Sequence, residues 1–250
     1  MKYWLVMGCS ILLSWAHADP IKLATSGGFA PFTDQNWKNQ GMVIQILDQV
    51  MRVADFEPEI IFHDGWGELI SDTEAGLYDA TFPWYYSAER DEQYLLSDSL
   101  ASTYVMPYVA KNKIFSVTTR MDLAGYRLCR PAGYFTHDLE ELFEDPNTEL
   151  IQPNTLVECF EMLVRDEVDV VPVDLFSAKT AIASTFESAD EVQQLGIVFS
   201  RQSMHLLVSR NHPNGEDIIA RVNQALSRLE MRGILQAIRQ NHTSLYLKQF

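Results

Sequence analysis

Short apolar strand-like segments alternate with amphipathic helical segments along this chain, and the alternation occurs twice. In the first half, residues 21–25, 59–62 and 79–82 are strand-like runs. Between them, apolar residues recur at helical spacing over residues 42–54, and residues 66–76 predict a short helix that ends at a glycine. The order strand, helix, strand, helix, strand indicates a parallel α/β layer.

The same order begins again near residue 126. The strand-like runs are residues 126–129, 149–151 and 168–173, and the predicted helices are residues 138–143 and 155–165, with helical patterns at 218–229 and 234–238 closing the chain. Thr155 and Glu158 form the pattern of a capping box at the start of one helix. Two α/β units of similar size, with no low-complexity linker between them, predict two lobes rather than one sheet.

The first eighteen residues have the features of a cleavable export signal. Lys2 precedes an apolar run from residue 3 to residue 15, and Ala16-His17-Ala18 is a small-x-small cleavage site. The run from Val6 to Cys9 faintly resembles a lipid-attachment box, but cleavage there would leave almost no apolar segment upstream. We therefore predict cleavage after Ala18 and a periplasmic location.

Charge and motif content exclude several classes of function. The formal net charge of −15 repels phosphate backbones, so we expect no nucleic-acid partner. After residue 18 no segment is apolar enough to span a membrane, and we expect a soluble monomer. The sequence has no G-x-S-x-G, P-loop, Rossmann or H-E-x-x-H motif, and its histidines lack ligand spacing. We therefore predict no metal, no cofactor and no enzymatic activity.

Two cysteines remain once the signal is removed. Cys129 and Cys159 would then lie in an oxidising compartment, where they can form one disulfide. A bridge that closes about 30 residues would add about 3 to 4 kcal/mol of stability in the chain-entropy model. The alternative is a pair of buried free thiols.

A set of motifs along the chain resembles the family 3 solute-binding proteins, which are the polar amino-acid receptors of ABC importers. Ser87-Ala88-Glu89-Arg90, followed by residues 94–98 (YLLSD), is similar to that family's S/T-x-x-R…F-S-D motif. Further matches follow the family's order: residues 29–32 (FAPF), Gly41, residues 122–128 (DLAGYRL), residues 168–174 (VDVVPVD) and residues 229–238. The resemblance covers essentially the whole mature chain.

This resemblance implies an α/β fold of the two-lobed type II periplasmic-binding-protein class, with a hinge of two crossings. The signal peptide would be residues 1–18 and the first lobe residues 19–103, which residues 199–250 complete; the second lobe would be residues 104–198. The crossings would lie near residues 102–104 and 198–203. A small-molecule ligand would bind in the cleft between the lobes.

Two charged residues are candidates for holding the ligand. In the family, the arginine that corresponds to Arg90 takes the ligand carboxylate, and a guanidinium offers a planar, bidentate fork for that group. The alternative for Arg90 is a surface ion pair with Glu89 or Asp91. The aspartate that corresponds to Asp174 takes the ligand ammonium; here it ends an apolar strand, where open α/β sheets place ligands.

Aromatic residues are the third group of candidates. Phe29 and Trp66 match family positions that enclose the ligand side chain, and Trp84 and Tyr85 follow the third strand. Such rings offer stacking and cation–π surface, although some of them could belong to the core.

The family's second-lobe anion loop, G-T-T, is replaced here by Gly133, Tyr134 and Phe135. Tyr85 and Pro83 also replace small hydroxyl residues of the family. These departures predict a wide aromatic site for an amino-acid-like or aromatic carboxylate ligand.

Three functions are consistent with these features. The first is delivery of a ligand to an ABC permease, and the second is a sensory role with a membrane receptor; no residue separates them. The third is an enzyme like the periplasmic cyclohexadienyl dehydratases, which resemble this fold. That chemistry requires a general acid in the cleft, for which Glu68 and Asp174 are the candidates.

Overall fold

The computed structural model describes residues 20–63 and 65–250. The predicted signal peptide, residues 1–18, lies outside the described residues.

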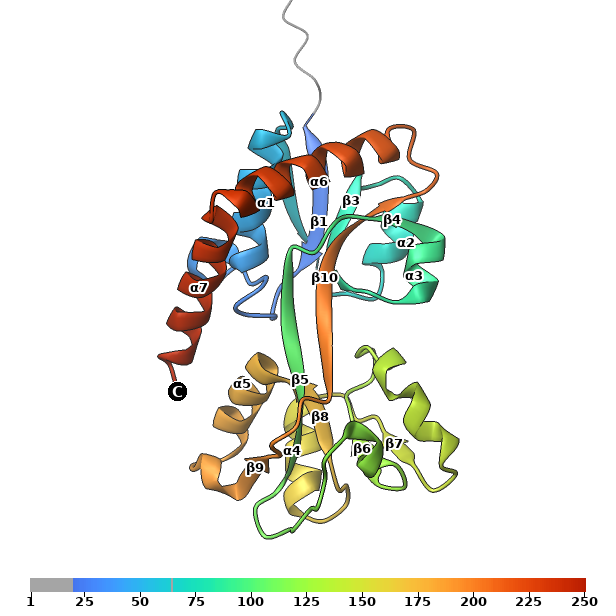
Figure 1. The fold of residues 1–250 in the computed structure, drawn as a ribbon, viewed down its shortest axis with the longest axis vertical. Helices are drawn as coiled ribbons and strands as arrows, with labels where there is room; N and C mark the ends of the chain where they lie inside the picture. Colours follow the sequence, from blue (N-terminus) through green and yellow to red (C-terminus); the bar gives the residue numbers. More distant parts are fainter. Residues whose placement is uncertain (1–19, 64) are drawn as a thin grey trace, which may run out of the picture.

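The described chain forms two bodies that two long strands connect (Figure 1). We call the body that contains both the first and the last described elements lobe 1, and the other body lobe 2. Lobe 1 contains β1 (Ile21–Ser26), η1 (Lys38–Gln40), α1 (Met42–Val53), β2 (Pro58–His63), α2 (Leu69–Glu74), β3 (Ala80–Tyr85), α3 (Ala88–Gln93), β4 (Tyr94–Leu96), α6 (Gly215–Met231) and α7 (Ile234–Leu247). Lobe 2 contains η2 (Arg120–Leu123), β6 (Arg127–Cys129), η3 (His137–Glu144), β7 (Glu149–Ile151), α4 (Leu156–Val164), β8 (Val171–Asp174), α5 (Leu175–Thr185), η4 (Ala189–Glu191) and β9 (Val192–Gln194). The connecting strands are β5 (Ala101–Ala110) and β10 (Ser200–Ser209).

The predicted parallel layer forms the centre of lobe 1. Strand β1 pairs in parallel with β2 on one side and with β3 on the other, in the order that the sequence pattern indicates. Helix α1 shares one hydrophobic core with β1 and β3, and α6 and α7 pack against α1 (Figure 1). Its apolar positions Val43, Ile46, Leu47 and Val50 are fully buried, because a 3.6-residue period brings them to one face. The core of lobe 1 therefore forms as the periodicity predicts.

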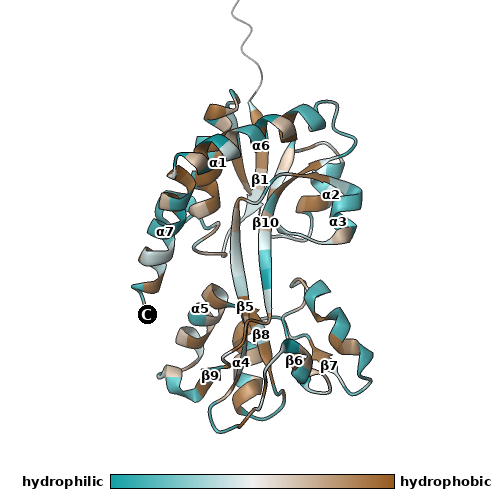
Figure 2. Cartoon of the chain, in the orientation of Figure 1, coloured by the Kyte–Doolittle hydropathy of each residue, from teal (hydrophilic) through white to brown (hydrophobic). Residues whose placement is uncertain are grey.

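The connecting strands lie side by side between the lobes. Residues 101–105 of β5 pair antiparallel with residues 200–204 of β10. Beyond this shared stretch, β10 pairs with β3 and β4 in lobe 1, and β5 pairs with β8 and β9 in lobe 2. Figure 2 shows hydrophilic colour on β10 between the lobes, as expected for a strand with little core around it.

This pairing corrects the prediction that the chain forms two lobes rather than one sheet, because the two lobes share a sheet. The two lobes have separate hydrophobic cores, but one hydrogen-bonded ladder runs from β2 through the connecting strands to β8. The ladder is continuous because β5 and β10, with ten residues each, are long enough to pair in both lobes. The lobe boundaries near residues 103 and 198 stay a prediction.

Lobe 2 is built around β8, with α4 and α5 packed against one another beside it. Strands β6 and β7 form a separate parallel pair, joined to the rest by a bridge between Leu128 and Val170. The helix predicted at residues 138–143 is the 3-10 helix η3, which extends beyond the predicted range by one residue at each end. The capping box at the start of α4 is confirmed: the N–H of Glu158 donates to Thr155 Oγ1 at 3.2 Å, and the N–H of Thr155 donates to Glu158 Oε2 at 2.9 Å.

Cys129 and Cys159 form a disulfide, the pairing predicted from the sequence. Cys129 ends β6, and Cys159 lies in the middle of α4. Both side chains are fully buried, so the bridge joins the smaller sheet of lobe 2 to the core around α4.

A buried histidine joins the last helix of lobe 1 to its first. In α7, His242 accepts at Nδ1 from Trp37 Nε1 at 3.0 Å, and its Nε2 lies 2.8 Å from Gln45 Oε1. An indole nitrogen can only donate, so Nδ1 carries no proton and Nε2 donates to Gln45. Burial lowers the pKa of His242, and the charge of Lys38 lowers it further.

We expect the protein to lose stability as the pH falls below about 6.5, the pKa of a histidine in an unfolded chain. In that range the unfolded chain takes up a proton that folded His242 resists, which favours unfolding; above it the contribution of His242 is fully present. Chemical denaturation at pH 8 and pH 5 measures the change. His242→Asn should reduce the difference, and the remainder includes His205, whose pKa burial also lowers. An equal difference in both proteins would contradict the role of His242.

None of the helices in residues 20–63 and 65–250 has the length and hydropathy needed to span a membrane.

Candidate binding cleft

A cavity of about 200 Å³ lies where the two lobes face one another. All eight residues that the sequence proposed as ligand-binding line it: Phe29, Trp66, Trp84, Tyr85, Arg90, Tyr134, Phe135 and Asp174. The first five come from lobe 1 and the last three from lobe 2, with Asp174 at the carboxyl end of β8. The structure thus brings the candidates together, and their binding role stays a proposal.

Arg90 lies in the first turn of α3, whose N-cap is Ser87. Its guanidinium donates from Nη1 to the carbonyl oxygen of Tyr85 at 2.7 Å. The alternative ion pair with Glu89 or Asp91 is absent from the described residues. Glu89 Oε2 instead lies 3.9 Å from Nε2 of His137. Burial lowers the pKa of Arg90, but a guanidinium stays charged. Within residues 20–63 and 65–250, only Nη1 of its guanidinium has a hydrogen-bond partner, so its other donors can meet an anion in the cavity.

The Arg90 guanidinium also lies over two aromatic rings. Its Cζ lies 5.0 Å from the ring centroid of Trp84 and 5.6 Å from that of Phe135. Trp84 belongs to lobe 1 and Phe135 to lobe 2, so Arg90 contacts both sides of the cleft. Both rings also line the cavity, so their predicted role in ligand stacking stays a prediction.

Asp174 combines two positions, the end of β8 and the N-cap of α5. Its Oδ1 accepts from the N–H groups of Phe176 and Ser177, both at 3.0 Å. The side chain is almost completely buried, and burial raises its pKa, although the hydrogen bonds from Ser177 and Phe176 and the charge of Arg130 act in the opposite direction. A cation in the cavity would favour the charged carboxylate.

The aromatic rings on the lobe 1 side of the cavity contact their neighbours edge to face. The ring of Phe29 lies 6.3 Å from that of Trp66 and 6.4 Å from that of Tyr85, and Trp66 lies 5.5 Å from Trp84. Tyr85 also meets Phe135 of the other lobe at 5.5 Å, and burial raises the pKa of its hydroxyl well above the usual value. An undissociated Tyr85 hydroxyl can donate a hydrogen bond into the cavity.

Gly133, Tyr134 and Phe135 belong to the loop between β6 and η3, which we call the wall loop (residues 131–136). Gly133 has a φ of 81°, a left-handed conformation that favours glycine. Tyr134 is 42% exposed and Phe135 is half-buried, so neither belongs to the core of lobe 2. The alternative that some candidate rings belong to the core concerned lobe 1, where Tyr85 packs against the hydrophobic core and also lines the cavity.

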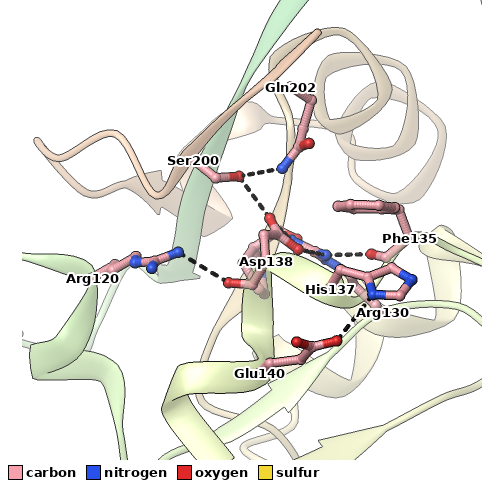
Figure 3. Close-up of polar contacts among 9 residues, drawn as sticks. Arg120, Arg130, Phe135, His137, Asp138, Glu140, Ser200 and Gln202 are labelled. Carbon is pink, nitrogen blue, oxygen red and sulfur yellow. Dashed lines mark hydrogen bonds and ion pairs between the residues drawn. The ribbon is translucent and has the colours of Figure 1, made fainter. Parts of the chain in front are cut away.

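Sequence reasoning missed four polar residues that line the cavity: Arg130, Asp138, Ser177 and Gln202. Figure 3 shows that Arg130 and Asp138 face one another, with Ser200 and Gln202 of β10 beside them. One signal was available, because Arg130 is a charged residue directly after an apolar strand and before a Pro-Ala-Gly turn. Asp138 and Gln202 carry no comparable local signal.

Two other expectations concern chemistry. Glu68, one of the two candidate general acids, has a side chain that is 79% exposed and does not line the cavity, whereas Asp174 does. Within the described residues, no group of three or more His, Cys, Asp or Glu side chains is placed to hold a metal ion.

Comparison with known proteins gives one family and many similar structures. The sequence model of the bacterial extracellular solute-binding proteins, family 3, matches residues 21–244. A comparison with curated proteins finds no significant match.

Among solved structures, the GluR0 ligand-binding core from Nostoc punctiforme in complex with L-glutamate is 20% identical, with a TM-score of 0.67 over 89% of this chain and 99% of that one. The arginine-, lysine-, histidine-binding protein ArtJ from Geobacillus stearothermophilus is 21% identical, with a TM-score of 0.67 over 89% and 94% of the two chains. A histidine kinase sensor domain with similarity to periplasmic binding proteins is 18% identical, with a TM-score of 0.72 over 90% and 96%. At these identities the likeness establishes the two-lobed fold.

Proposed function

Because this chain belongs to the bacterial extracellular solute-binding proteins of family 3, we propose that it captures a small polar ligand between its two lobes in the periplasm. The ligand is an amino-acid-like molecule or an aromatic carboxylate. The observation that carries this proposal is Arg90: its side chain lines a cavity between the lobes and has no ion-pair partner among the described residues.

The cavity offers complementary groups for such a ligand. Arg90 provides a cation for a carboxylate, and Asp174, on the facing lobe, provides a buried acidic group for a hydrogen-bond donor or an ammonium. Phe29, Trp66 and Tyr85 supply apolar surface between these two ends. A volume of about 200 Å³ is below the usual range for drug-sized ligands, which supports a small molecule.

The arrangement of the lobes gives a physical account of capture. Arg90 belongs to lobe 1 and Asp174 to lobe 2, so a ligand that meets both makes its full set of contacts only when the lobes are close. A ligand shifts the balance between open and closed states by its difference in affinity for them. Closure around the ligand is the signal that a partner protein in the membrane would recognise.

We propose an ABC permease as that partner, in keeping with the family. A membrane sensor is the second candidate, and the likeness to a histidine kinase sensor domain favours it. Both partners would bind the same closed form, so the ligand site is common to the two functions.

We propose binding without turnover. Of the two candidate general acids, Asp174 is held as the N-cap of α5 through two backbone hydrogen bonds. Asp138, the other carboxylate in the cavity, is paired with Arg130. Both carboxylates therefore have structural partners within the protein, and the turnover assay below tests whether Asp174, whose pKa burial raises, also acts as an acid.

A thermal-shift screen tests the proposal. The panel contains proteinogenic amino acids, polyamines, organic acids and aromatic carboxylates, including prephenate and arogenate. A ligand at 100 times its Kd adds about 2.7 kcal/mol to the free energy of unfolding, so a true ligand raises the melting temperature clearly. We expect carboxylates to do so and polyamines without a carboxylate to have no effect. Stabilisation by polyamines alone, or product formed from prephenate or arogenate, would contradict the proposal.

A further inference from the structure

A buried ion pair supports the lobe 2 side of the cleft. The side chains of Arg130 and Asp138 are only 4% and 6% exposed. Nη1 of Arg130 donates to Asp138 Oδ1 at 2.5 Å, and Nη2 donates to Oδ2 at 3.0 Å, which is a bidentate arrangement (Figure 3). A buried pair of this kind is weak evidence for stability, because desolvation of both charges offsets much of their attraction. Its bonds to other elements indicate a second role.

Arg130 uses its other donors to hold two segments of backbone. Nε donates to the carbonyl of Pro172 in β8 at 2.6 Å, and Nη1 donates to the carbonyl of Phe135 in the wall loop at 2.5 Å. All three guanidinium nitrogens of Arg130 therefore donate to groups within the protein, in contrast to those of Arg90. Its position fixes where the backbone of Phe135 lies relative to β8.

Asp138 extends these contacts to a connecting strand. Its Oδ2 accepts from the hydroxyl of Ser200 at 2.6 Å, and Ser200 is the first residue of β10. The Ser200 oxygen in turn accepts from Nε2 of Gln202 at 3.0 Å, and Gln202 lines the cavity. A continuous set of bonds thus runs from the wall loop through two buried charges to the strand that enters lobe 1.

We propose that Asp138 is a positioning residue that couples the wall loop to β10. Asp138 pairs with Arg130 and accepts from Ser200. A displacement of Phe135 in the cleft would therefore be transmitted to the beginning of the connecting strand β10. Phe135 is well placed to sense the cavity, because its ring meets both Arg90 and Tyr85 of the opposite lobe. The inference rests on the proposed function only in taking this cavity as the ligand site.

Hydrogen–deuterium exchange on the unliganded protein tests the coupling through Ser200→Ala, which removes one hydroxyl and leaves the ion pair in place. The reporters are the N–H groups of Ala132 and Tyr134 in the wall loop, which donate to the carbonyls of Pro153 and Pro131. We expect them to exchange about fivefold faster, the change that loss of one ordinary hydrogen bond makes to a local opening equilibrium. The amides of α1 report global unfolding and should keep their rates.

Ser200→Thr is the matched control, because it retains the hydroxyl and suits a strand. It should leave wall-loop exchange at the wild-type rate. Faster exchange that is confined to residues 199–203 in Ser200→Ala, with the wall loop unchanged, would overturn the proposal.

A second variant removes the pair itself without leaving one charge unpaired. Arg130→Met combined with Asp138→Leu replaces the two charges by apolar side chains, a change that buried ion pairs often tolerate. The wall loop should then exchange at least as fast as in Ser200→Ala, and wild-type exchange in both variants would refute the coupling. Because no ligand is added, these outcomes are independent of the thermal-shift screen.

Discussion

Arg90→Ala is expected to weaken carboxylate binding by about 2 to 5 kcal/mol, the usual cost of truncating one partner of a buried charge pair. In Kd this is roughly a 30- to 5,000-fold loss. The loss is large because the ligand carboxylate would remain in an aromatic cavity without a partner for its charge. Calorimetric titration of wild type and variant, with a carboxylate that stabilises the wild type in the screen, measures it.

The matched control for this variant is Arg201→Ala. It removes the same charge from an exposed arginine on β10 whose side chain donates to Ser102 Oγ and does not line the cavity. Binding by this control should change little, which separates direct contact from long-range electrostatics. Arg90→Lys should fall between wild type and alanine, because an ammonium keeps the charge without the fork. If Arg90→Ala binds as tightly as the control, Arg90 is not the anchor.

Loss of the disulfide is expected to lower the free energy of unfolding by about 3 to 4 kcal/mol, from the chain entropy of a loop of this length. Cys129 and Cys159 are 30 residues apart in sequence, and both are fully buried in the core of lobe 2. The unfolded chain without the bridge gains freedom that the cross-linked chain lacks. Denaturant titration of the double variant Cys129→Ala, Cys159→Ala measures the difference.

Reduced wild-type protein is the control for packing, because it keeps both side chains in place and lacks only the cross-link. We expect it to account for most of the loss. Alkylation in denaturant without reductant provides an independent check. Wild-type protein that takes up two alkyl groups under these conditions would contradict the bridge.

The local parts of the fold could be predicted because their physical causes lie close together in the sequence. The period of the apolar residues in α1 specifies its buried face, and Thr155 and Glu158 cap α4 from within four residues. The positions of Arg90 and Asp174 follow from a motif and from the end of an apolar strand.

The Arg130–Asp138–Ser200 contacts could not be predicted in the same way. Asp138 is eight residues from Arg130, but Ser200 is 62 residues further along, and only the tertiary fold brings it to the carboxylate. The strand β10 also could not be predicted, because it depends on a neighbour that is distant in sequence. Residues 200–203 are Ser-Arg-Gln-Ser, with no apolar alternation, and they form a strand because β5 lies beside them. Pairing partners of this kind are set by tertiary context rather than by local pattern.

The double position of Asp174 restricts how this cleft can be redesigned. The carboxylate that we propose as a ligand contact also caps the N-terminus of α5 by accepting two backbone N–H groups. A change of specificity at this position has to keep a good N-cap residue, which favours asparagine, serine, threonine or glycine. Selectivity for a new ligand is therefore easier to engineer at the aromatic residues of lobe 1, because Phe29 and Trp66 cap no helix.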